Sequence, residues 1–181
     1  DLGRSRIVDK RRYYAIDTVP NGWLEQMPAG YTLHQLNHDL LTQPDLKQAS
    51  KLDWLTYIYG DADTFLDLGY GFCIVSDNQI VCDCPVFLVG TERCEVAIDT
   101  DEPHRRKGLA TVTASATIEH LLKNGFQSVV WGCSEYNEPS WRTAERIGFT
   151  LAGQYEEHYC MFDEAGHWAE AGWIALRDGR Y

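Results

Sequence analysis

The chain has 181 residues, enough for one domain with a full apolar core, and its 44% hydrophobic and 24% charged residues are typical of a globular protein. The formal net charge of −11 disfavours nucleic acids and anionic membranes as partners. Solubility alone explains this charge, and a cationic substrate such as an amine is the more specific interpretation. No apolar run is long enough to span a bilayer, and the charged stretch Asp1–Tyr14 is not expected to be a secretory signal.

Three segments divide the chain. Residues 1–30 contain turn-forming Pro and Gly and predict an irregular N-terminal arm. Residues 31–161 predict the folded domain, and residues 162–181 a helical extension, with a helix at Ala165–Leu176. Because the chain does not begin with methionine, we expect it to start inside a longer gene product with an upstream segment missing.

The first half of the domain is predicted to place short helices before a three-stranded antiparallel meander. Apolar spacing predicts helices after a first strand at Tyr31–Asn37, the last one capped by Asp61 or Asp63. These helices are expected at 38–41, 44–59 and 64–68. The period then changes to alternation, which predicts strands at 71–75, 80–89 and 93–100.

The second half alternates helices with strands. We expect a helix at Gly108–Lys123, a strand at Ser128–Cys133, a helix at Pro139–Ile147 and a strand from Phe149 to Tyr155 or Met161. A strand–helix–strand order implies parallel pairing through a crossover. The fold class is therefore α/β, with a central mixed sheet flanked by helices.

The six cysteines show no Cys-x-x-Cys motif, and no histidine has the spacing of a metal ligand. Cys82 and Cys84 share one strand face, which is only a weak metal pattern. We therefore expect buried thiols, a reducing cytoplasm and no metal.

A basic turn, Arg105-Arg106-Lys107-Gly108-Leu109-Ala110, stands between a predicted strand and a predicted helix. A helix start carries unpaired N–H groups and partial positive charge, and small residues let a diphosphate approach the main chain. By these properties alone, a diphosphate site and a solvated basic turn are equally good interpretations.

The turn resembles the (Gln/Arg)-x-x-Gly-x-(Gly/Ala) signature of GNAT acetyltransferases. Asn137-x-x-Ser140 follows at the usual distance, and the second helix runs into Gly148-Phe149, like the family's terminal Gly-Phe. Gly69–Cys73, Asp99–Glu102 and the start of the 108–123 helix are similar to a bacterial subgroup, the zwittermicin-resistance-type acetyltransferases. The resemblance covers residues 31–161 and implies the acyl-CoA N-acyltransferase fold.

The resemblance implies acetyl-CoA as the cofactor. Main-chain groups before the turn would hold the pantetheine arm, the turn and helix start would hold the diphosphate, and Asn137 and Ser140 would contact the pantetheine amide and the phosphate end. A plain helix cap is the alternative for Asn137. The implied cofactor-binding residues are Ile98, Asp99, Thr100, Arg105, Arg106, Lys107, Gly108, Leu109, Ala110, Thr111, Asn137 and Ser140.

Catalysis would be direct attack of an amine on the thioester. Glu95 is the expected proton acceptor, with Glu92 and Asp99 as alternatives, and an amide near Ile98 could stabilise the oxyanion. Many family members place a tyrosine acid seven residues after the asparagine, where this chain has Ala144. The candidates for the acid are Tyr155, Tyr136, Ser134 and Tyr159, and an acyl-carrying Cys133 would be unusual.

The leading hypothesis is a bacterial, cytoplasmic N-acetyltransferase for a small-molecule amine. Residues 38–68, the 155–181 tail and any partner subunit would set the acceptor, and a homodimer is one expected assembly. A non-catalytic acyl-CoA-binding regulatory module is the alternative, which Ala144 favours. A different nucleotide-diphosphate protein ranks last, because both glycine-rich nucleotide motifs are missing.

Overall fold

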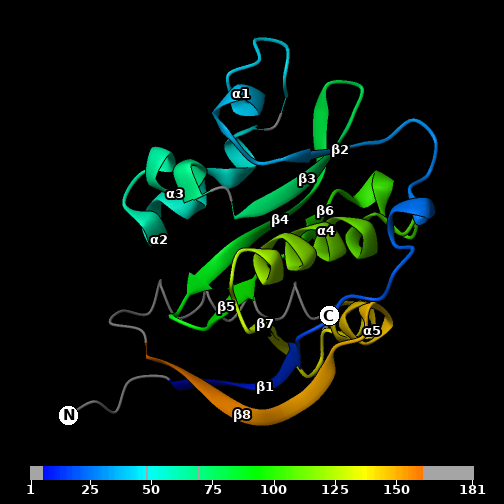
Figure 1. The fold of residues 1–181 in the computed structure, drawn as a ribbon. Coiled ribbons are helices and arrows are strands. Elements are labelled where there is room, and N and C mark those ends of the chain that lie inside the picture. The colour runs from blue at the N-terminus through cyan, green and yellow to red at the C-terminus, as the bar shows by residue number, and fades with distance from the viewer. Residues whose placement is uncertain (1–5, 48, 69, 161–181) are drawn as a thin grey trace. The chain divides into compact units, whose positions relative to one another are not determined.

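A computed structural model describes residues 6–47, 49–68 and 70–160 of the chain (Figure 1). Two compact units divide it. The larger unit comprises the described residues of 16–130, and the smaller unit those of 1–15 and 131–181. Each unit is described below by itself.

Strands of the larger unit lie in the order β2-β3-β4-β5-β7. The first pairs are antiparallel, whereas β7 runs parallel to β5, so the sheet is mixed as expected. The hairpin between β3 and β4 turns at Asp77 and Asn78, whose φ values of 51° and 58° suit a two-residue turn. The strands are β2 (Thr32–Gln35), β3 (Gly71–Ser76), β4 (Gln79–Val89), β5 (Arg93–Val96) and β7 (Ser128–Ser134).

The strand predicted over 93–100 is interrupted opposite Pro85. The Ala97 amide donates to the Pro85 carbonyl at 3.0 Å, but proline has no N–H to return the bond. The last part of the predicted strand is β6 (Asp99–Thr100), which also pairs with β4. Register is the same on both sides of the interruption, because Val96 lies opposite Val86 and Asp99 opposite Asp83.

Helices cover both faces of this sheet. Cys73 packs in one apolar cluster and its neighbour Ile74 in another, as alternation along β3 requires. The Cys73 face carries α1 (His38–Leu41), the 3₁₀ helix η2 (Ala49–Leu55), α2 (Thr56–Tyr59) and α3 (Ala62–Leu68). Two helical segments therefore replace the single helix predicted over 44–59. The Ile74 face carries α4 (Leu109–Lys123), which crosses β3 and β4 (Figure 1).

Hydroxyl groups join α4 to the sheet beneath it. Thr117 Oγ1 donates to the Cys84 carbonyl at 2.9 Å and accepts from the Phe72 amide at 3.2 Å. The buried Thr113 Oγ1 donates to the Leu109 carbonyl at 2.8 Å. Because these polar groups are satisfied inside the core, the helix start is held in a fixed place over β4.

The smaller unit places its strands in the order β7-β1-β8. Antiparallel pairing joins β1 (Arg6–Ile16) and β8 (Thr150–Cys160), with a bulge at Tyr13/Tyr14. Strand β1 shows that the irregular structure expected for residues 1–30 is wrong for residues 6–16. The division into arm, domain and extension stays a prediction, and the helix expected at 165–176 lies outside the described residues.

Candidate functional site

Two left-handed residues shape the basic turn that joins β6 to α4. After the 3₁₀ helix η3 (Glu102–His104), Arg106 has φ 61° and Gly108 has φ 82°. Arg105, which precedes them, is extended, with φ −64° and ψ 162°. A Cβ added to Gly108 would meet no atom within 4 Å, so the main chain is accessible there.

The amide N–H groups of residues 108–111 donate to no acceptor in the described part of the chain, and that of Lys107 closes a turn over Arg105 and Arg106. The first amide of α4 with a main-chain partner is that of Val112, which donates to the Gly108 carbonyl at 3.2 Å. Gly108 is the N-cap and supplies no capping side chain. These donors and the positive end of the helix dipole coincide at one place, so the turn has the geometry of a diphosphate cradle.

Basic side chains surround the cradle without acidic partners. Arg105 Nε donates to the Thr100 carbonyl at 2.9 Å, which ties the turn back to β6. Within residues 6–47, 49–68 and 70–160, Arg105, Arg106 and Lys107 form no ion pair. Their charge is therefore available to an anion at the open amides.

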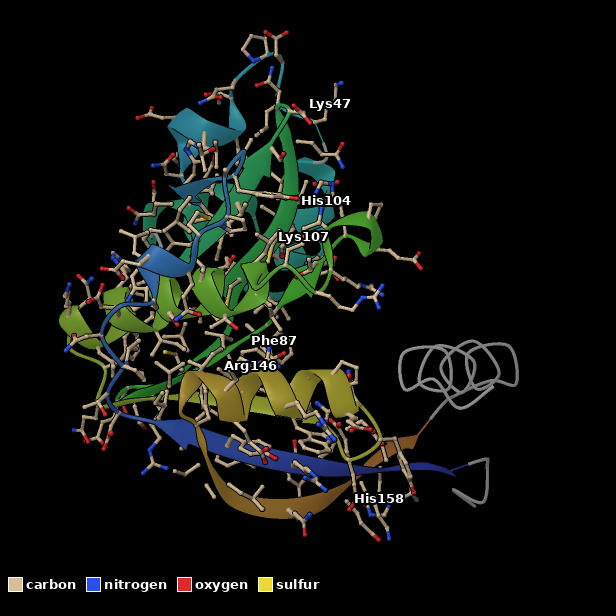
Figure 2. The ribbon with its side chains drawn as sticks, turned by 90° about the vertical axis from the view of Figure 1, so that its right-hand side faces the viewer. Lys47, Phe87, His104, Lys107, Arg146 and His158 are labelled. Carbon is tan, nitrogen blue, oxygen red and sulfur yellow. The ribbon has the colours of Figure 1, made fainter. Side chains whose placement is uncertain are left out.

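Tyr31 approaches this turn from the start of β2. Its Oη accepts from Lys107 Nζ at 2.9 Å and lies 3.0 Å from His104 Nδ1, and its ring meets the His104 ring edge-on. The side chains of His104 and Lys107 lie next to each other (Figure 2). Sequence reasoning placed Tyr31 only in a strand, because nothing local signals a contact with residues more than 70 positions away.

The pantetheine residues predicted from the sequence lie next to the turn. Asp99 and Thr100 form β6, opposite Asp83 and Cys82 of β4. Ile98 lies in the interruption before β6, and its amide has no acceptor within the described residues. Pairing between β5 and β7 is recorded only as far as Glu95 and Val130. Ile98 lies beyond the last paired residues of β5 and β7, so its amide can donate to a ligand.

The cysteines of the larger unit are buried free thiols. Cys82 Sγ lies 3.2 Å from Thr100 Oγ1 and 3.3 Å from Thr113 Oγ1, between β6 and α4. Burial raises the pKa of Cys94 to about 12 and that of Cys84 well above its usual value. The described residues contain no group of three or more potential metal ligands.

Two predicted contacts, Asn137 and Ser140, belong to the smaller unit and open α5 (Glu138–Ile147). Asn137 Oδ1 accepts from the Ser140 amide at 3.2 Å, so the helix-cap interpretation of Asn137 is confirmed. Ser140 Oγ accepts from the Trp131 indole at 3.0 Å. Cofactor contact by either side chain stays a prediction.

Both predicted catalytic residues lie on strands. Glu95 is half-buried in β5, between Leu88 of β4 and Val130 of β7. Tyr155 is 45% exposed in β8, opposite Arg11 of β1. Glu95 belongs to the larger unit and Tyr155 to the smaller, and their roles stay predictions.

The other acid candidates differ in accessibility. Ala144, at the usual tyrosine position, is fully buried in α5. Ser134 Oγ is buried and donates its proton in a 2.8 Å hydrogen bond to the Asp9 carboxylate. That proton is therefore not placed to reach a leaving group. Tyr136 is 47% exposed, while the side chain of Tyr159 lies outside the description. Cys133 is 4% exposed, which disfavours it as a nucleophile.

An apolar cavity lies within the helical segment that is expected to set the acceptor. Its volume is about 270 Å³. It is lined by Leu41, Leu52, Asp53, Leu55, Ala62, Phe65 and Leu66. Asp53, which is exposed, adds one carboxylate to an otherwise apolar lining.

None of the described helices has the length and apolar character needed to cross a bilayer. The mixed sheet and the helices on both of its faces define an α/β protein, and an open basic turn precedes α4. The GNAT acetyltransferase family matches residues 4–158, and the chain belongs to this family.

Known relatives agree with this assignment. The chain is 27% identical over 134 residues to the uncharacterized N-acetyltransferase YdfB of Bacillus subtilis (strain 168), covering 74% of this chain and 50% of the relative. It therefore spans about half the length of that curated relative.

Solved structures share the fold. A GCN5-related N-acetyltransferase-like protein from Streptococcus suis 89/1591 superposes with a TM-score of 0.64 at 19% identity, over 88% of this chain and 64% of that one. A GCN5-related N-acetyltransferase from Kribbella flavida gives 0.58 at 18% identity, over 93% and 64%. At these identities the likeness concerns the fold.

Proposed function

We propose that the chain is the catalytic part of an acetyl-CoA-dependent N-acetyltransferase, which moves an acetyl group to a primary amine of a small molecule. The open amides of residues 108–111 are the observation that carries this proposal. The sequence signature of the family does not by itself show that these amides lack acceptors. The family assignment and the unpaired cations of the turn support it. A bacterial cytoplasm is the proposed setting, which the buried thiols suit.

The residues present fit coenzyme A. The amides from Arg106 to Ala110 would hold the diphosphate, with the Arg105 and Arg106 side chains nearby and the Thr111 hydroxyl as a further donor. Main-chain groups of Ile98, Asp99 and Thr100 would hold the pantetheine arm. A side chain at position 108 would fill the space that a phosphate needs, and glycine leaves that space empty.

Acetyl-CoA, when bound, supplies the acyl group as an activated thioester. Glu95 accepts the proton that the ammonium form of the acceptor must lose before its nitrogen attacks the acetyl carbonyl carbon. The Ile98 amide donates to the carbonyl oxygen as charge develops. The sulfur of coenzyme A would leave as a thiolate that takes up one proton, and Tyr155 is our candidate for the group that would give it.

The acceptor is proposed to be a primary amine that carries an apolar group. The cavity bordered by Leu41, Phe65 and Asp53 offers apolar walls and one carboxylate, and the chain's net charge of −11 favours a cation. An antibiotic or amino-sugar amine and the zwittermicin-resistance-type subgroup remain our specific expectations. A homodimer, measurable by light scattering, is the expected assembly.

Thiol release from acetyl-CoA over a panel of amines tests the proposal in the full gene product. We expect turnover with at least one apolar primary amine. Glu95→Gln should lower kcat/KM by about 10²- to 10⁴-fold, with CoA affinity unchanged. Tyr155→Phe should slow turnover less, and Glu119→Gln, which alters an exposed ion pair of α4, is the matched control.

Two results would contradict the proposal in different ways. Tight CoA binding without turnover for any amine would indicate the non-catalytic acyl-CoA-binding module instead. If the protein did not bind CoA at all, the proposed coenzyme would be wrong. The assignment of the chain to its family and fold would not be affected.

A further inference from the structure

Three side chains from separate segments meet beside the cradle. Tyr31 precedes β2, His104 ends η3, and Lys107 precedes the N-cap of α4. Tyr31 Oη joins them, 2.9 Å from Lys107 Nζ and 3.0 Å from His104 Nδ1, and Lys107 Nζ lies 5.5 Å from the centroid of the Tyr31 ring. We call these residues the Tyr31 cluster.

The cluster keeps hydrogen-bond donors for a ligand. The Tyr31 hydroxyl can accept from Lys107 and donate its own proton to His104 Nδ1, which leaves Nε2–H of His104 as a donor. Lys107 retains further N–H groups, and neither side chain contacts a carboxylate within the described residues. In a protein of net charge −11, such unpaired donors fit an anionic group.

Sheet order places the cluster on the side of the cradle away from the pantetheine residues. Tyr31 leads into β2, which is separated from β4 by β3, whereas β6 lies along the other side of β4. In coenzyme A, the pantetheine arm and the nucleoside are attached to different phosphorus atoms of the diphosphate. With the arm along β6, the β2 side of the turn is the side left open to the phosphorylated ribose.

We propose that the Tyr31 cluster binds the 3′-phosphate of coenzyme A and makes the site prefer coenzyme A to its 3′-dephospho form. Lys107 and His104 supply the donors. Tyr31 is a positioning residue, which holds both side chains through its hydroxyl while its ring packs against the apolar cluster of Leu109 and Val112. This inference rests on the proposed function.

Calorimetry with coenzyme A and 3′-dephospho-coenzyme A tests the inference in the full gene product. The wild-type protein should bind coenzyme A about tenfold more tightly, which corresponds to about 1.4 kcal/mol. Lys107→Met should bring the ratio of the two dissociation constants close to one, mainly by weakening coenzyme A. Tyr31→Phe and His104→Ala should each reduce the ratio partly, while their folded states remain intact by circular dichroism.

Lys123→Met provides the matched control, since Lys123 lies at the other end of α4 and pairs with Glu119 at 3.2 Å. It should leave the ratio unchanged. Equal binding of both ligands by the wild type, or equal weakening of both by Lys107→Met, would overturn the inference and leave the proposed function standing. Binding of neither ligand would overturn the proposed function and the inference together. A ratio of affinities is insensitive to a general loss of stability, so a purely structural role of Tyr31 would not change it.

Discussion

The starts of α4 and α5 solve the same problem in opposite ways. Every helix begins with amides that lack partners inside the helix. At α5, Asn137 accepts from an amide of the first turn and Glu138 provides the acidic charge that the helix dipole favours. At α4, the N-cap is glycine, the first turn has no acid, and arginines and a lysine precede it.

The difference separates stability from function. Cations at a helix start are unfavourable, and uncapped amides forgo about 1 kcal/mol of stabilisation. A helix start of this kind is explained when an anion supplies the missing partners. The capped start of α5 stabilises its own helix, whereas the uncapped start of α4 is suited to binding a ligand.

The largest expected effect comes from closing the open start. Gly108→Asp puts a carboxylate where the anion would lie, in a backbone conformation that favours glycine. We expect coenzyme A affinity to fall about 100-fold, or about 2.7 kcal/mol, by calorimetry. Gly125→Asp is the control, because Gly125 also has a positive φ and no atom within 4 Å of an added Cβ, but ends α4. Equal losses in both variants would show that backbone strain, not the cradle, matters.

A medium effect should follow from opening the closed start. Asn137→Ala removes the side chain that accepts from the Ser140 amide, and we expect the free energy of unfolding to fall by about 1 kcal/mol in denaturant titrations. Asn137→Asp, which retains a capping oxygen, should restore most of it. If Asn137→Ala weakened coenzyme A binding without lowering stability, the contrast between the two starts would be wrong, and the cofactor contact predicted for Asn137 would be favoured.

Local sequence predicted much of this contrast. The basic residues, Gly108 and the first residues of α4 are adjacent in the chain. Their pattern therefore predicts an open helix start without knowledge of the tertiary structure. Tyr31 was missed because its partners, His104 and Lys107, come close only after β2 pairs with β3. The interruption at Ala97 follows from Pro85, but only once the register of β4 is known.

Strand β1 was missed for a related reason. Its many basic residues are typical of a solvated arm when read alone. In the fold, Lys10 lies opposite Glu156 of β8, and Arg11 Nε lies 3.3 Å from a carboxylate oxygen of Glu157. Opposite charges across paired strands stabilise a sequence that propensity alone would leave irregular. The partner strand begins more than 130 residues later, so no local pattern could reveal it.

The smallest effect concerns a third helix start, that of α3, where the cap is an exposed acid. Asp61 Oδ1 accepts from the Thr64 amide at 2.7 Å, and this bond lowers the pKa of Asp61. A carboxylate with a lowered folded-state pKa stabilises the helix above its unfolded pKa of about 3.9, and the stabilisation is lost as the pH falls through the folded value. The protection factors of the α3 amides, which are exchange rates corrected for the intrinsic effect of pH, should therefore fall at acid pH. Asp61→Asn should abolish that pH dependence, whereas Asp45→Asn, which changes an exposed acid outside this cap, should retain it.

Asp61 is fully exposed, so solvent screens its charge, and the change of pH should affect only the local order of α3. The start of α4 has no capping side chain, and its order should depend chiefly on whether its ligand is bound.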